Sequence, residues 1–263
     1  MRRVIERRAL VRLAALGLGG LSIACGRGER TSPQTTRGVA ELPTQAARAT
    51  TPAGGGERPP AAPTSAPVEV VRGDPVCLVT KQQGLGASYT PPDLMPLPVR
   101  VSASDGLRLR RPATEAVTAL IEAAAGEGQV LFVLSAFRSF QEQDVVLQTE
   151  IRLLGRTVAE RQVAPPGHSE HQLGLAVDLT TKRAPYELRA EMGQEAEGRW
   201  LTLHAPRFGY VISYPQGKEA VTGYTYEPWH IRFVGKPLAE QVSASGLTLT
   251  EFLPKHNLAG PCP

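Results

Sequence analysis

The sequence contains little cysteine, and its N-terminal apolar stretch is too short to cross a membrane. Only 3 of the 263 residues are cysteine, and no two of them stand in a C-x-x-C spacing. The apolar stretch at residues 13–24 has about 12 residues, whereas a membrane-spanning helix needs about 20. These absences exclude a cysteine-based metal site and a transmembrane interpretation of this stretch.

Three common hydrolase motifs are also missing. No serine is followed three residues later by lysine, so the S-x-x-K nucleophile motif of penicillin-binding peptidases is absent. The chain has no H-E-x-x-H, which excludes the helix-borne zinc site that this motif marks. Its cysteines lie at the export signal and at the edges of the expected domain, which argues against a thiol peptidase.

Residues 1–25 have the order of an export signal, with a basic start, a short apolar region and small residues before a cleavage point. They end in Leu-Ser-Ile-Ala-Cys, which is similar to a bacterial lipoprotein cleavage site, although Ser22 stands where leucine is usual. Arg7 and Arg8 also resemble the pair of a twin-arginine signal. We therefore expect an exported protein, anchored on the extracytoplasmic side by a lipid on Cys25; an uncleaved anchor would lead to the same compartment.

The basic charge of the chain is confined to this signal. Residues 1–24 hold five arginines and one acid, which accounts for the whole formal net charge of +4. A basic protein often binds nucleic acid. Because this excess belongs to a segment that export removes, we expect no nucleic-acid partner.

The remaining chain divides into a linker and one folded domain. Residues 26–74 are dominated by Pro, Thr, Ala, Gly and Ser without apolar periodicity, which predicts a flexible tether. We expect the domain to span residues 75–263. Cys77 and Cys262 flank it outside the cytoplasm, where disulfides persist, so we expect these two cysteines to pair.

The pattern of the domain predicts an α+β fold, with a mainly antiparallel sheet packed with helices. A capping box at Ser139 and Glu142 predicts a helix that runs to about Leu154 and ends at Gly155. Other helices are expected at residues 114–125 and 199–204. Strands are expected at residues 130–134, 174–179, 210–213 and 229–234.

Two clusters of acids and histidines carry the chemistry. His171 and Asp178 lie seven residues apart, and Glu227 precedes His230 at the start of another expected strand. A catalytic zinc takes three nitrogen or oxygen ligands, and a nearby carboxylate can take the proton of the attacking water. From spacing alone, a buried network of satisfied polar groups explains the clusters equally well.

A third segment, residues 135–143, runs from the end of a strand to the start of a helix, where functional side chains are common. Arg138 in this segment could offer a fixed cation to a developing oxyanion or to a substrate carboxylate. If the segment stood alone, a surface arginine would be the better interpretation.

Taken in order, the three segments resemble the zinc D-alanyl-D-alanine carboxypeptidases of the VanY type. The family motif S-x-H-x-x-G-x-A-x-D is matched at Ser169, His171, Gly174, Ala176 and Asp178. The motif E-x-W-H is matched at Glu227, Trp229 and His230. A Y-R-S/T-x-x-x-Q-like segment is matched at Arg138, Ser139 and Gln143, with Phe137 where tyrosine is usual. The resemblance covers roughly residues 120–235.

The resemblance implies a single zinc site on the sheet, with one Zn²⁺ per chain. The ligands would be His171, Asp178 and His230. Glu227 would act as the base, and Arg138 would stabilise the tetrahedral intermediate. The resemblance further assigns substrate binding to Ser169, Gln143 and Trp229.

The substrates implied are peptidoglycan stem peptides, from which a D,D-carboxypeptidase removes the terminal D-alanine. Close relatives cut the L,D bond of tetrapeptide stems instead, and the motifs do not separate the two activities. An endopeptidase activity is a further alternative. A peptidoglycan-binding module that kept the fold but lost turnover is the alternative from another class, and the complete ligand set with an intact Glu227 favours the enzyme. The sequence does not indicate an oligomeric state.

Overall fold

The computed structural model of the 263-residue chain describes residues 12–13, 76–98, 102–184 and 187–263. The expected linker, Cys25 and the expected signal, apart from Arg12–Leu13, therefore lie outside the described residues. Among the described residues, no helix has both the length and the apolar character that crossing a bilayer requires.

The centre of the domain is a four-stranded sheet in the order β4-β5-β8-β7. All three pairs of neighbouring strands are antiparallel. The strands are β4 (Leu131–Ser135), β5 (Ala176–Thr181), β7 (Tyr210–Ile212) and β8 (His230–Phe233). The expected α+β class with an antiparallel sheet is confirmed.

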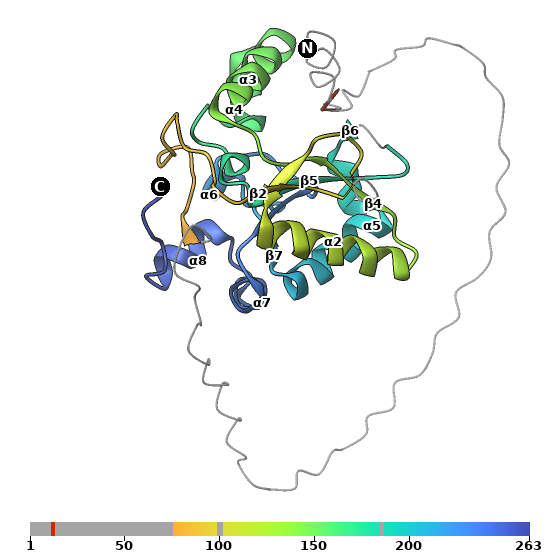
Figure 1. The fold of residues 1–263 in the computed structure, drawn as a ribbon. Helices are drawn as coiled ribbons and strands as arrows, with labels where there is room; N and C mark the ends of the chain where they lie inside the picture. The colour runs from red at the N-terminus through yellow and green to blue at the C-terminus, as the bar shows by residue number, and fades with distance from the viewer. Residues whose placement is uncertain (1–11, 14–75, 99–101, 185–186) are drawn as a thin grey trace, which may run out of the picture. The chain divides into compact units, whose positions relative to one another are not determined.

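Helices lie on both sides of this sheet in Figure 1, where α3 and α4 stand together above it and α2 and α7 lie below it. The α-helices are α2 (Arg111–Gly126), α3 (Phe140–Leu154), α4 (Arg156–Gln162), α5 (Ala196–His204), α6 (Glu219–Thr222), α7 (Lys236–Ser245) and α8 (Leu249–Lys255). Three short 3-10 helices join them, η3 (Glu170–Leu173), η4 (Ala190–Gln194) and η5 (Ala205–Phe208).

Two smaller sheets complete the described secondary structure. Strands β2 (Leu94–Pro96) and β3 (Arg108–Arg110) pair in antiparallel fashion. Strands β1 (Arg12–Leu13) and β6 (Glu187–Leu188) pair in parallel.

Helix α3 shows how local sequence sets an element. The Ser139 hydroxyl accepts a hydrogen bond from the Glu142 backbone N–H, and the Glu142 carboxylate accepts one from the Ser139 N–H. This capping box satisfies backbone donors that a helix start leaves without partners. The helix ends at Gly155, whose φ of 79° is costly for other residues. Both predicted ends are confirmed.

Strand β5 is buried along its whole length, and its two faces serve different purposes. Val177 and Leu179 belong to the main hydrophobic core. Because side chains alternate along a strand, Asp178 points away from them, toward the opposite face of the sheet. The sheet is thus packed on one face and carries a buried carboxylate on the other.

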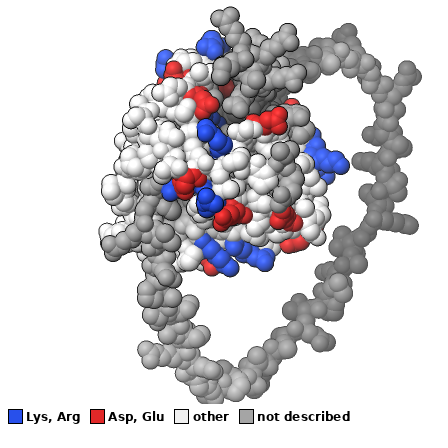
Figure 2. All heavy atoms as spheres, viewed as in Figure 1, with Lys and Arg blue, Asp and Glu red and all other residues white. Residues whose placement is uncertain are grey.

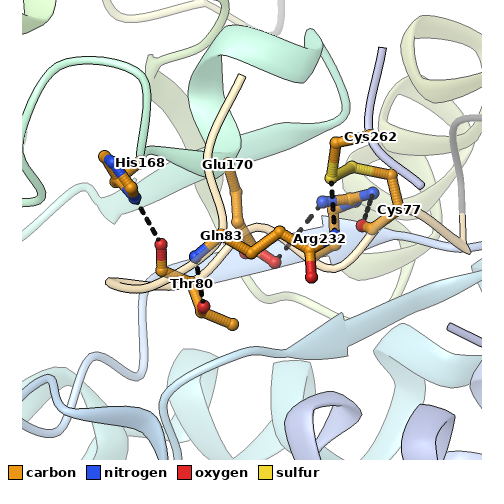
Figure 3. Close-up of a disulfide and its surroundings, with 7 residues drawn as sticks. All are labelled: Cys77, Thr80, Gln83, His168, Glu170, Arg232 and Cys262. Carbon is orange, nitrogen blue, oxygen red and sulfur yellow. Dashed lines mark hydrogen bonds and ion pairs between the residues drawn. A yellow bond between two sulfur atoms is a disulfide. The ribbon is translucent and has the colours of Figure 1, made fainter. Parts of the chain in front are cut away.

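A disulfide joins Cys77 to Cys262, the pairing that we expected (Figure 3). The two residues are separated by 185 positions, so the bond closes nearly the whole domain into one loop. Next to it, Cys77 forms an isolated β-bridge with Gly260. The two ends of the domain are therefore held together by covalent and hydrogen bonds.

We expect the double substitution Cys77→Ser and Cys262→Ser to lower the free energy of unfolding by about 2–5 kcal/mol, because a long cross-link restricts the unfolded chain. Urea unfolding of both proteins without reductant measures this difference. A reductant should shift the midpoint of the original protein but not that of the double variant. Equal midpoints without reductant would show that the disulfide does not stabilise the domain.

The charged side chains on the face shown in Figure 2 are mixed in sign, and neither sign gathers over a large area. This agrees with a chain whose formal excess of +4 is carried by residues 1–24. On this face the domain offers no extended basic surface.

Candidate metal centre

A row of polar residues crosses strands β4, β5 and β8 of the central sheet and continues just beyond the end of β7. The strand register pairs Ser135 with Asp178 and Asp178 with His230. Just after β7, the Ser213 N–H donates to the carbonyl oxygen of His230 over 3.4 Å. Cross-strand neighbours have side chains on the same face of a sheet. The register thus brings Asp178 and His230 together, although 52 residues separate them.

The second histidine comes from the turn before β5. The Ser169 hydroxyl caps η3 by accepting a hydrogen bond from the His171 N–H over 3.3 Å. Gly174 ends this helix with a φ of 66°, and a Cβ there would lie 2.9 Å from Leu94. Only glycine fits this turn comfortably. The turn delays the strand to Ala176, two residues later than predicted.

Three donor groups meet where this turn covers the sheet. His171 Nε2 lies 3.1 Å from Asp178 Oδ2, and His230 Nδ1 lies 2.9 Å from Asp178 Oδ1. One ligand atom from each residue lies within 4.8 Å of the other two, and all three residues are buried. Two imidazoles and one carboxylate are the donor set of a catalytic zinc with one position left open. The residues therefore fit one such ion.

The ring of His171 is held in a single orientation. Its Nδ1 lies 2.7 Å from the carbonyl oxygen of Ala136, which can only accept a hydrogen bond. Nδ1 therefore carries the proton, and the Nε2 lone pair faces Asp178. Metal-binding histidines usually use their second nitrogen in this way, which fixes tautomer and direction.

The three groups perturb one another's pKa. Burial alone would raise the pKa of Asp178, but the charge and hydrogen bonds of His171 and His230 lower it far below its ordinary value. Burial lowers the pKa of His171, and this effect outweighs the attraction of Asp178. These pKa shifts favour an ionised Asp178 and a neutral His171, the forms in which a carboxylate and an imidazole bind a metal.

Glu227 precedes strand β8, as the motif led us to expect. Its carbonyl oxygen accepts a hydrogen bond from the His230 N–H over 3.1 Å, so residues 227–230 form a tight turn through Pro228. Among the described residues, no hydrogen bond reaches the Glu227 carboxylate. Burial raises the pKa of this carboxyl to about 8, against the opposing effect of His230 and with reinforcement from Asp178.

Arg138 lies at the rim of the same cluster. Its guanidinium donates to Gln143 Oε1 over 2.7 Å and to Ser135 Oγ over 2.8 Å. Another contact places it 4.0 Å from Asp178 Oδ2. The side chain is 19% exposed, so part of it remains accessible to solvent. The sequence placed Arg138 near the site, and the structure brings it to the ligands.

Gln143 and Trp229, for which substrate roles were expected, both have partners within the protein. The Gln143 amide is buried, accepts from Arg138, and donates to the carbonyl oxygen of Ala164 over 2.7 Å. Trp229 is a buried member of the main hydrophobic core. These contacts favour supporting roles for both residues, and the Ser169 hydroxyl is used as a helix cap.

Residues that the motif analysis did not single out surround His230. Glu170 Oε2 lies 3.0 Å from its Nε2, and the ring of Tyr214 stacks on it at 4.9 Å. The hydrogen bond to Asp178, followed by that to Glu170 and their charges, raises the pKa of His230 to about 10 despite burial. Glu170 stands inside the first motif, but its partner is 60 residues away, so local sequence does not indicate the contact.

The chain matches the family model for VanY, D-alanyl-D-alanine carboxypeptidase, over residues 106–236. It is 38% identical over 183 residues to YodJ of Bacillus subtilis, which is named for an inferred carboxypeptidase activity. This alignment covers 68% of the present chain and 67% of YodJ. The family match spans every motif residue discussed above.

Two solved structures are similar in both sequence and fold. The first is the LD-carboxypeptidase LdcB, with 39% identity, a TM-score of 0.63, and coverage of 68% of this chain and 85% of LdcB. The second is the vancomycin-resistance D,D-pentapeptidase VanY in complex with Zn(II), with 32% identity, a TM-score of 0.58, and coverage of 68% and 98%. Together with the buried cluster of two histidines and an aspartate, these likenesses show that the chain belongs to the VanY family of zinc-dependent D-alanyl-D-alanine carboxypeptidases.

Proposed function

We propose that this protein is a zinc carboxypeptidase that removes the C-terminal D-alanine from peptidoglycan stem peptides. The observation that carries the proposal is the buried cluster of His171, Asp178 and His230, with the Glu227 carboxylate beside it. A binding module that had lost turnover would not need a buried acid with a raised pKa at this place. The related VanY structure in complex with D-alanine-D-alanine supports the choice of substrate.

A zinc ion held by these three side chains would polarise the scissile carbonyl and lower the pKa of its bound water. Glu227 is placed to accept a proton from the attacking water at one of its carboxylate oxygens. It can then deliver this proton to the nitrogen of the departing D-alanine, because burial favours the protonated form of the carboxyl and raises its pKa. The Glu227 side chain is buried, so bulk water has little access to its carboxylate during either proton transfer.

Arg138 supplies the fixed positive charge of the site. The hydrogen bonds from its guanidinium to Gln143 and Ser135 hold the group still before substrate binds. A preorganised cation stabilises negative charge that develops on a carbonyl oxygen without further rearrangement. The same group suits the C-terminal carboxylate of a peptide, which arginine can bind with two parallel hydrogen bonds.

We expect Arg138→Lys to lower kcat/KM by about 10²-fold, because lysine keeps the charge but loses the guanidinium that Gln143 and Ser135 hold. Bound zinc should remain at the level of the original protein. Arg156→Lys on α4, whose side chain is 66% exposed, is the matched control and should leave the rate unchanged. Full activity of Arg138→Lys would remove the guanidinium from the mechanism.

The second candidate is an L,D-carboxypeptidase that acts on tetrapeptide stems. The specific observation in its favour is the likeness to LdcB, at 39% identity against 32% for the VanY structure. Both reactions release D-alanine from the same kind of peptide. Therefore the zinc cluster and Glu227 serve either candidate equally well.

A matched pair of substrates tests the proposal. Zinc-loaded protein is incubated with a pentapeptide stem ending in D-alanyl-D-alanine and with a tetrapeptide stem ending in a single D-alanine. We expect faster D-alanine release from the pentapeptide. Faster release from the tetrapeptide would establish the L,D activity, and release from neither would contradict the proposed function.

We further propose that the enzyme works on the extracytoplasmic side of the membrane, tethered by a lipid on Cys25 and by residues 26–74. A random coil of 49 residues would have a root-mean-square end-to-end distance of about 35–40 Å. Mass spectrometry of the membrane-bound protein should find a lipid on Cys25, and Cys25→Ala should release it from the membrane. An unmodified Cys25 in membrane-bound protein would contradict this anchor.

A further inference from the structure

His230 is held through both nitrogens of its ring, and two different carboxylates hold it. Nδ1 lies 2.9 Å from Asp178, whereas Nε2 lies 3.0 Å from Glu170. Only Nδ1 is directed toward the other expected ligands. Nε2 points away from the cluster, to an acid that the metal site does not use.

Glu170 is itself fixed by neighbours on the sheet. The Ser213 hydroxyl donates to the same oxygen, Oε2, over 2.6 Å. The other oxygen, Oε1, lies 3.4 Å from the Arg232 guanidinium (Figure 3). The acid is therefore buried and restrained at both oxygens.

The sheet explains this arrangement. His230 and Arg232 are two residues apart on β8, so their side chains leave the same face. Ser213 follows β7 and lies next to His230. Helix η3 crosses this face, with His171 directed toward Asp178 and its neighbour Glu170 directed toward His230. Two consecutive residues therefore contact opposite members of the cluster.

Arg232 connects Glu170 to the segment around Cys77, where the disulfide joins the two ends of the domain. Its side chain is fully buried, and it donates to the carbonyl oxygens of Cys77, over 3.3 Å, and of Phe233, over 3.1 Å. Figure 3 shows Glu170 and the Cys77–Cys262 disulfide on either side of this guanidinium. The positive charge of Arg232 compensates the buried charge of Glu170, since an unpaired buried carboxylate is costly.

We propose that Glu170 is a positioning residue for the metal site. It accepts the Nε2–H of His230 and thereby leaves Nδ1, which faces Asp178, as the nitrogen that would exchange its proton for the cation. A carboxylate that bonds the second nitrogen of a metal-binding histidine fixes its tautomer and raises its basicity. The inference rests on the zinc site of the proposed function, but it concerns metal affinity and does not depend on which peptide bond is cut.

The test is Glu170→Gln, which keeps the size and an acceptor oxygen but removes the charge. We expect the zinc dissociation constant, measured by competition with a chromogenic chelator, to rise by about 10–100-fold. The visible spectrum of the Co²⁺-substituted protein should also change, because the donor strength of His230 changes. The matched control is Glu150→Gln, a buried acid of α3, which should alter neither reading.

A purely structural Glu170, needed only to neutralise Arg232, predicts a different result. Glu170→Gln would then lower the midpoint of thermal unfolding but leave the zinc dissociation constant and the Co²⁺ spectrum of the folded protein unchanged. That result would overturn the proposal. An original protein that binds zinc tightly but releases no D-alanine would instead contradict the proposed function alone.

Ser213→Ala provides the measurement if Glu170→Gln does not fold. This substitution removes the hydroxyl that restrains Oε2 of Glu170 but leaves the pair with Arg232 in place. We expect weaker zinc binding, by about 3-fold or more, at the lower end of the effects known for outer-shell partners. An unchanged dissociation constant in this variant would contradict the proposal.

Discussion

Glu227→Gln is expected to bind zinc as the original protein does while kcat for D-alanine release falls by at least about 10³-fold. General acid–base catalysis contributes about 10²–10⁴-fold to such reactions. The amide has nearly the size of the carboxyl but cannot accept the proton of the attacking water. Because the three expected ligands are unchanged, metal content should not fall.

The surroundings of Glu227 give the reason for expecting so large an effect. Its carboxylate is buried beside His230, and burial raises its pKa to about 8. A group with a pKa near the working pH both accepts and releases a proton readily. Among the described residues, the other acids at the cluster, Asp178 and Glu170, are both engaged in hydrogen bonds. Neither can therefore take over the proton transfer from Glu227.

The measurement is the rate of D-alanine release at a saturating concentration of the peptide substrate, together with the zinc content of the same samples. Glu240→Gln serves as the control, because this acid lies on α7 and its side chain is 50% exposed. Retained turnover in Glu227→Gln would remove Glu227 from its assigned role. Loss of zinc in this variant would instead show that Glu227 takes part in holding the metal.

Asp178→Asn is expected to weaken zinc binding strongly and to abolish activity at limiting zinc. The Asp178 carboxylate lies between the two histidines, within 3.1 Å of His171 and 2.9 Å of His230. Structural zinc sites bind with about 10–16 kcal/mol from four ligands, so losing one ligand should weaken binding roughly 10²–10³-fold. Activity at limiting zinc should then fall to background.

This substitution should also change how zinc affects stability. In the original protein, zinc at a concentration about 100 times its dissociation constant should stabilise the fold by about 2.7 kcal/mol. In Asp178→Asn the same zinc concentration should hardly move the midpoint of thermal unfolding. Asp144→Asn, on the exposed surface of α3, should behave as the original protein does. A full zinc-dependent shift in Asp178→Asn would exclude Asp178 as a ligand.

Features set by neighbouring residues were predictable from the sequence. The capping box at Ser139 and the glycine at 155 define both ends of α3, because each acts within a few residues. The zinc cluster was supported weakly by spacing and strongly by the order of the motifs. The strand register that joins Asp178 to His230 was not readable, because pairing over 52 residues depends on the whole sheet.

Contacts between residues far apart in the sequence could not be predicted. Gln143 matches a family motif, but its buried amide contacts Arg138 and Ala164, which no local pattern indicates. Trp229 lies between two functional residues, yet it belongs to the core. Helix α7 was also not predicted, because it begins at Lys236-Pro237 without a side-chain cap.

The central claim is that a metal held by His171, Asp178 and His230 makes this chain a carboxypeptidase. The most direct test is D-alanine release from a pentapeptide stem by one sample measured as purified, after removal of metal with a chelator, and after addition of one equivalent of Zn²⁺. We predict activity in the first state, none in the second, and recovery in the third. Undiminished release by the metal-depleted protein would contradict this claim.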